Sequence, residues 1–135
     1  MLQGSGKLEA LTRKIIGCGI AVHRAFGAGL LESIYKTCFG IDLRAAGLSF
    51  AAERRVPIVY RGIEVCADYR IDLIVEDTVV VEIKAVQSLA PVHIAQVITY
   101  LKLTNCPVGL LMNFNVPLLN EGIRRVVHPD CQLRV

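Results

Sequence analysis

The chain has 135 residues, of which 53% are hydrophobic, 20% charged and 6% aromatic, with no Trp. This length fits a single domain over residues 1–135, and the high apolar share excludes a largely disordered chain. The net charge of only +3 excludes a strongly basic, histone-like nucleic-acid-binding protein. The charge is uneven: residues 1–61 carry nine basic and four acidic side chains, whereas residues 62–135 carry six basic and eight acidic ones.

The cysteines indicate a reducing compartment. All five are scattered along the chain and none forms a CxxC pair, which argues against a disulfide scaffold and against a zinc ribbon. We therefore expect a cytoplasmic protein without a secretory signal. The two long uncharged segments, 85–101 and 103–120, contain too many polar residues and prolines to cross a bilayer, so no membrane partner is expected.

Two helices are predicted in the first third of the chain. Apolar residues recur at three- and four-residue steps, which is typical of an amphipathic helix with one core-facing side. These residues are Leu8, Leu11, Ile15, Cys18 and Val22. Residues 26–29 break the pattern, and a second helix should cover 30–46 and end at Gly47. Residues 1–7 are expected to be flexible.

The pattern then changes to a period of two, which is typical of β-strands. Residues 56–60 alternate and predict a short strand. Residues 63–73 predict a longer strand with one apolar and one charged face. A turn at 76–78 leads into a third strand over 79–85.

A third helix is predicted over 91–103, because Pro91 suits the first helical position and the apolar residues after it follow a helical spacing. Residues 108–114 form an apolar run that predicts a buried strand, and the tail should add a short helix and an edge strand around 123–127. The order of elements is helix, helix, three strands, helix, strand and tail. This order predicts a mixed α/β fold, with a sheet flanked by helices.

Asp72, Glu82 and Lys84 form the most informative pattern for function. The period of a strand places Glu82 and Lys84 on the same face. Asp72 joins them only if the turn at 76–78 has an odd number of residues, since a two-residue loop would put the two acids on opposite faces. The odd loop is favoured, because only then do the apolar faces of the two strands coincide.

Two carboxylates and a lysine in this arrangement can bind a divalent cation and activate a water beside it. Hard oxygen ligands favour Mg²⁺ or Mn²⁺. The metal would polarise a phosphodiester and lower the pKa of a bound water, while Lys84 would orient that water or offset the developing charge.

The same residues resemble the core motif of the PD-(D/E)XK nuclease superfamily, with Asp72 followed by Glu82-Ile83-Lys84. The wider sequence is similar to the small GxxExxY branch of that superfamily. The matching stretches are residues 29–35 (GLLESIY), 69–73 (YRIDL), 81–86 (VEIKAV), 91–96 (PVHIAQ) and 113–117 (NFNVP). The resemblance extends from about residue 11 to residue 127. It departs from the branch at Ala25, Phe26 and Ala28, and at Lys36, where an acid is common.

The resemblance implies a restriction-endonuclease-like core and metal-dependent cleavage of nucleic-acid phosphodiesters, with DNA as the expected substrate. By position, Asp72 and Glu82 would ligate the metal, with the carbonyl of Ile83 as a third ligand. Lys84 would be the catalytic lysine.

The resemblance also assigns three residues on the predicted helices. Glu32 matches the acidic residue that many members bring to the metal or its water. Gln96 and Tyr100 match a QxxxY helix motif that supports the site.

Each of these residues also has a structural interpretation. Asp72, Glu82 and Lys84 could form an ordinary cross-strand salt-bridge ladder. Glu32 could pair with Lys36 four residues later. The helix face with Gln96 and Tyr100 could simply hydrogen-bond to a neighbouring strand.

His93 is more consistent with a helix-terminal or core role than with catalysis, because no second histidine lies at a ligand spacing. For the whole chain, the alternative to a nuclease is a non-catalytic module that keeps the fold and forms a homodimer, which the high apolar content would suit. A third hypothesis is a metal-dependent phosphohydrolase that acts on nucleotides.

Overall fold

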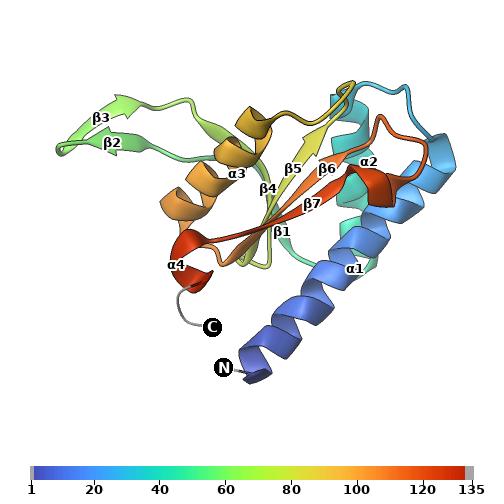
Figure 1. Cartoon of the computed structure of the whole chain (residues 1–135), viewed down its shortest axis with the longest axis horizontal. Helices are drawn as coiled ribbons and strands as arrows, with labels where there is room; N and C mark the ends of the chain where they lie inside the picture. The colour runs from blue at the N-terminus through green and yellow to red at the C-terminus, as the bar shows by residue number, and fades with distance from the viewer. Residues whose placement is uncertain (1, 133–135) are drawn as a thin grey trace.

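A mixed five-stranded sheet forms the centre of the protein (Figure 1), in a computed structural model that describes residues 2–132. The β5–β6 pair is parallel, and the other neighbouring strands are antiparallel. In spatial order the strands are β1 (Phe50–Arg55), β4 (Arg70–Val75), β5 (Val79–Lys84), β6 (Val108–Asn113) and β7 (Ile123–Val127).

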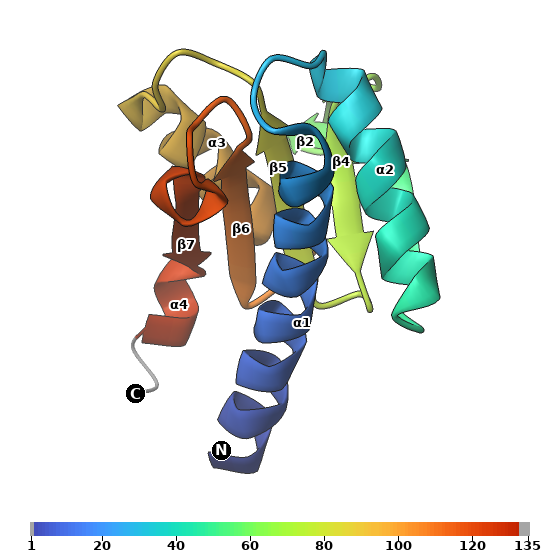
Figure 2. The ribbon, with the colours of Figure 1, turned by 90° about the vertical axis from the view of Figure 1, so that its right-hand side faces the viewer.

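Helices cover both faces of this sheet (Figure 2). Helices α1 (Leu2–Phe26) and α2 (Glu32–Ala45) lie on one face and α3 (Pro91–Thr104) lies on the other. Each interface buries its own apolar cluster, and the residues of β5 and β6 alternate between the two clusters. A short 3₁₀ helix, η1 (Leu119–Gly122), precedes β7, and the short helix α4 (Pro129–Gln132) follows it.

This architecture confirms the predicted mixed α/β fold with a sheet flanked by helices. Helix α1 begins at Leu2 rather than at Leu8, and the flexibility of residues 1–7 stays a prediction. Strand β1 was not predicted, because its sequence, FAAERR, ends in three charged residues and shows no alternation. Within residues 2–132, no helix has both the length and the apolar character that a membrane span requires.

The prediction of one strand over 63–73 is wrong. The segment contains two strands in different sheets, β3 (Ile63–Cys66) and β4. Strand β3 pairs with β2 (Ile58–Tyr60) in a hairpin that projects from the body of the protein (Figure 1). The exposed apolar side chains of this hairpin, between 58% and 67% accessible, are Val59, Tyr60, Ile63 and Val65. Alternation continues through the break, so periodicity alone could not reveal that the two halves face different surroundings.

The register between β4 and β5 is the one favoured from the sequence. Leu73 pairs with Val81 and Val75 with Val79, so the turn has three residues and is centred on Asp77. Asp72 and Glu82 are therefore level with each other on neighbouring strands. Helix α3 covers the apolar residues on the face of β5 that carries Glu82, so only part of this face is open to solvent.

Candidate catalytic and metal-binding site

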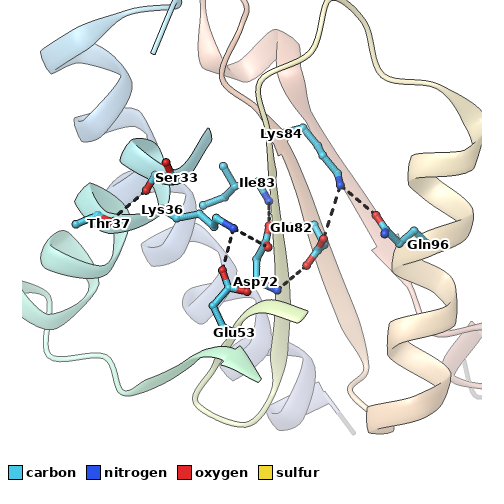
Figure 3. Close-up of polar contacts among 9 residues, drawn as sticks. All are labelled: Ser33, Lys36, Thr37, Glu53, Asp72, Glu82, Ile83, Lys84 and Gln96. Atoms are coloured by element: carbon cyan, nitrogen blue, oxygen red, sulfur yellow. Dashed lines mark hydrogen bonds and ion pairs between the residues drawn. The ribbon is translucent and has the colours of Figure 1, made fainter. Parts of the chain in front are cut away.

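Asp72 and Glu82 are held together by reciprocal hydrogen bonds where β4 begins and β5 ends (Figure 3). The backbone N–H of Asp72 donates to Glu82 Oε2 at 2.8 Å, and the backbone N–H of Ile83 donates to Asp72 Oδ2 at 2.9 Å. Each carboxylate thus satisfies a backbone amide of the other strand, just beyond the last paired residues of the ladder. This arrangement differs from a surface salt-bridge ladder, because the two acids lie side by side and are buried or nearly so.

Lys84 lies on the α3 side of this pair. Its Nζ is 3.9 Å from Glu82 Oε1 and donates a hydrogen bond to Gln96 Oε1 at 3.1 Å. Gln96 projects from α3 toward the end of β5 (Figure 3). The structure therefore brings together Asp72, Glu82, Lys84 and Gln96, as the sequence predicts.

Burial gives Glu82 an unusual protonation equilibrium. Its side chain is 3% exposed, and this burial, together with the nearby Asp72 carboxylate, raises its pKa to about 8. The hydrogen bond from the Asp72 amide and the ammonium groups of Lys84 and Lys36 act in the opposite direction without cancelling the effect. A further positive charge placed beside Glu82 would therefore favour its ionised form.

Lys36 approaches Asp72 from the other side, although neither it nor its second partner was predicted as a site residue. Its Nζ donates to Asp72 Oδ1 at 3.2 Å and to Glu53 Oε1 at 2.9 Å. Burial works against the charged ammonium, yet the hydrogen bonds and charges of Glu53 and Asp72 hold the pKa of Lys36 above its ordinary value. No sequence signal indicated Glu53, because the strand that carries it was not predicted.

Glu32 is the first residue of α2 and is half-buried. Among the described residues its carboxylate has no ion pair, and Lys36, its alternative partner in the sequence, pairs with Glu53 and Asp72 instead. The start of α2 is fixed by Tyr35, whose hydroxyl donates to the carbonyl of Gly27 at 2.5 Å and accepts from the N–H of Leu30 at 3.1 Å. The structure thus defines the position of the GxxExxY segment but leaves the role of Glu32 a prediction.

Two residues of α3 complete the surroundings. Tyr100 is buried, and its ring packs edge-on against Tyr69 with centroids 5.5 Å apart. Burial and the nearby Glu82 carboxylate raise the pKa of the Tyr100 phenol, which therefore stays neutral. His93 accepts a hydrogen bond from the N–H of Ala90 through Nδ1 at 2.9 Å, which confirms the helix-terminal role favoured from the sequence.

A family model described as the PD-(D/E)XK nuclease superfamily matches residues 9–126. The chain belongs to this superfamily. No curated protein and no solved structure matches it. The five-stranded mixed sheet with helices on both faces is consistent with a restriction-endonuclease-like fold, and membership of the PD-(D/E)XK superfamily supports a nuclease-type function on nucleic acid.

PD-(D/E)XK nucleases typically use divalent metals, and the oxygen donors of this chain fit such an ion. One oxygen of each acid, Asp72 Oδ1 and Glu82 Oε1, is not used by the backbone amides. Among the side chains that the structure describes, no three His, Cys, Asp or Glu residues are grouped closely enough to hold a metal by themselves. Two carboxylates completed by water and substrate phosphate are the usual protein environment of Mg²⁺.

Proposed function

We propose that the protein is a metal-dependent nuclease that hydrolyses phosphodiester bonds in nucleic acid, with DNA as the expected substrate and Mg²⁺ or Mn²⁺ as the cofactor. Within the superfamily we assign it to the GxxExxY branch. The observation that carries the proposal is the reciprocal Asp72–Glu82 pair, with Lys84 beside Glu82.

In this proposal Asp72, Glu82 and the carbonyl of Ile83 hold the metal, and Glu32 supports its water. When bound, the metal supplies a Lewis acid that polarises the phosphate and lowers the pKa of a bound water. The Lys84 ammonium orients the attacking water or offsets charge that develops on the phosphate oxygens.

The residues of α3 keep this lysine in place. Gln96 accepts a hydrogen bond from Lys84 Nζ and thereby limits the directions in which the ammonium can point. Tyr100 packs beside Glu82 and, with the apolar residues under α3, excludes water from behind the carboxylate.

The Glu82→Ala variant tests this proposal. We expect Mg²⁺-dependent cleavage of DNA or RNA to fall at least about hundredfold, because one of the two metal-binding carboxylates is lost. Glu64→Ala, which removes an exposed carboxylate from β3, is the matched control and should cleave like the wild type. Circular dichroism should show that both variants are folded, and an unchanged cleavage rate in Glu82→Ala would rule out the assigned site.

A second candidate function is a non-catalytic homodimeric module that retains the fold. The exposed apolar side chains of the β2–β3 hairpin favour it, since contiguous exposed apolar surface often marks a protein interface. Isothermal titration calorimetry distinguishes the two functions. Binding of Mn²⁺, and of DNA in its presence, supports the nuclease, whereas neither event together with a dimeric mass in sedimentation supports the module.

A further inference from the structure

Three neighbouring strands present a carboxylate at the same level of the sheet. In the pairing of β1 with β4, Ala52 lies opposite Leu73 and Arg54 lies opposite Ile71, so Glu53 falls level with Asp72. Asp72 is in turn level with Glu82 on β5. Glu53 therefore occupies the next position outward from the proposed metal-binding pair.

The backbone of Glu53 is unusual for a strand. Its φ of 51° lies in the left-handed region, which residues other than glycine adopt at a cost of about 1 kcal/mol or more. This conformation interrupts the regular pairing between β1 and β4 at that residue. Such local strain persists only where surrounding contacts maintain it, and the contact that Glu53 makes is with Lys36.

Lys36 is shared between the two acids (Figure 3). Its Nζ is 2.9 Å from Glu53 Oε1 and 3.2 Å from Asp72 Oδ1. Because the backbone amide of Ile83 donates to Oδ2, Oδ1 is the Asp72 oxygen that remains available to a metal. A hollow of about 380 Å³ opens beside these three residues, between α2 and β1. The ammonium therefore has space to move off Asp72 while it keeps its contact with Glu53.

We propose that Lys36 and Glu53 form a built-in counter-ion device that sets the affinity of Asp72 for a divalent cation. Lys36 neutralises Asp72 in the metal-free protein and withdraws toward Glu53 when a divalent cation binds. Glu53 is thus a positioning residue that acts through Lys36 and not a metal ligand. This inference rests on the proposed function, because it assumes a metal at Asp72 and Glu82.

The two residues should affect metal binding in opposite directions, and the effect of Glu53 should require Lys36, which a general effect of charge would not. Without Lys36, the cation no longer competes with an ammonium for Asp72 Oδ1 and should bind more tightly. Without the charge of Glu53, Lys36 has only Asp72 as a partner and should compete more strongly. If both residues merely supported the fold, both substitutions would weaken metal binding.

Calorimetric titration of the full chain with Mn²⁺ tests the proposal. We expect Lys36→Met to bind Mn²⁺ about tenfold more tightly than the wild type and Glu53→Gln about tenfold more weakly. Substitution of residues that contact metal ligands typically changes metal affinity on this scale. In the double variant, the Glu53→Gln substitution should have no further effect, because its effect requires Lys36. Lys36→Arg, which keeps the charge, should stay within about threefold of the wild type.

Two controls separate this contact from charge in general. Lys102→Gln removes an exposed positive charge from α3, and Glu64→Gln removes an exposed negative charge from β3; both should bind Mn²⁺ like the wild type. If Lys36→Met leaves Mn²⁺ binding unchanged or weakens it, the inference is wrong while the proposed function stands. If Glu53→Gln still weakens binding in the double variant, Glu53 is a direct ligand. If the wild type binds no Mn²⁺, the proposed metal site and this inference fall together.

Discussion

At the scale of single residues, Glu82 links burial to pH dependence. Its pKa is raised from 4.5 to about 8, first by burial and then by Asp72. A carboxyl group whose pKa rises on folding binds its proton more tightly in the folded state than in the unfolded chain. Its contribution to the stability of the metal-free protein is therefore most favourable below pH 4.5 and is lost as the pH rises from 4.5 through about 8.

The Glu82→Gln variant should remove this pH dependence, because a neutral amide can still accept the hydrogen bond from the Asp72 amide. Relative to the wild type, we expect the variant to gain on the order of a few kcal/mol in free energy of unfolding between pH 5 and pH 9. Urea denaturation in EDTA at both pH values measures the difference. Parallel pH profiles for the two proteins would show that Glu82 is ionised in the folded state at neutral pH.

The sequence predicted part of the site at this scale and missed another part. Spacing and the resemblance indicated Asp72, Glu82, Lys84 and Gln96, because each lies in an element whose periodicity is clear. Glu53 could not be found in this way, since its strand lacks alternation and its backbone leaves the β-region. The sequence indicated Lys36 as a possible partner of Glu32. That Lys36 pairs with Asp72 instead depends on how α2 packs on the sheet.

At the scale of elements, close contact between α3 and β6 determines where Gln96 lies. Gly109 of β6 lies beneath α3, and a Cβ added there would be 2.5 Å from Cγ1 of Val97. The chain leaving β5 is fixed from the same strand, because the Asn113 side chain bonds both the N–H and the C=O of Val86. Lys84 and Gln96 therefore meet because both of their elements are held by β6.

The Gly109→Ala variant tests this packing. The added methyl group must displace a short, branched side chain, and we expect a loss of about 1–3 kcal/mol in free energy of unfolding. Gly17→Ala on α1 is the matched control: a Cβ there meets no atom within 4 Å, so this variant should gain about 1 kcal/mol from helix propensity. Urea denaturation measures both, and equal stability of Gly109→Ala and the wild type would show that α3 can shift away without cost.

At the scale of the whole molecule, the sequence predicted the fold class but not the hairpin that projects from the body. The alternation of helical and strand periods indicated a layered α/β domain, and the helices cover both sheet faces as expected. The sequence predicted β3 and β4 as one strand, because the apolar residues of β3 continue the alternation of β4, and so gave no sign that the β2–β3 hairpin projects from the body. Hydrophobic periodicity reports the local backbone geometry, whereas burial depends on which layer lies above the strand.

A matched pair of substitutions tests this division between body and hairpin. Ile63 on β3 is 67% exposed, whereas Ile71 on β4 is fully buried under α3, although both lie in the segment predicted as one strand. Ile71→Ala should cost about 2–5 kcal/mol in free energy of unfolding, because it leaves a cavity in the core. Ile63→Ala should change that free energy by less than about 0.5 kcal/mol, as for other surface substitutions. Chemical denaturation of both variants measures the difference, and a loss above about 2 kcal/mol for Ile63→Ala would show that the hairpin folds back onto the body.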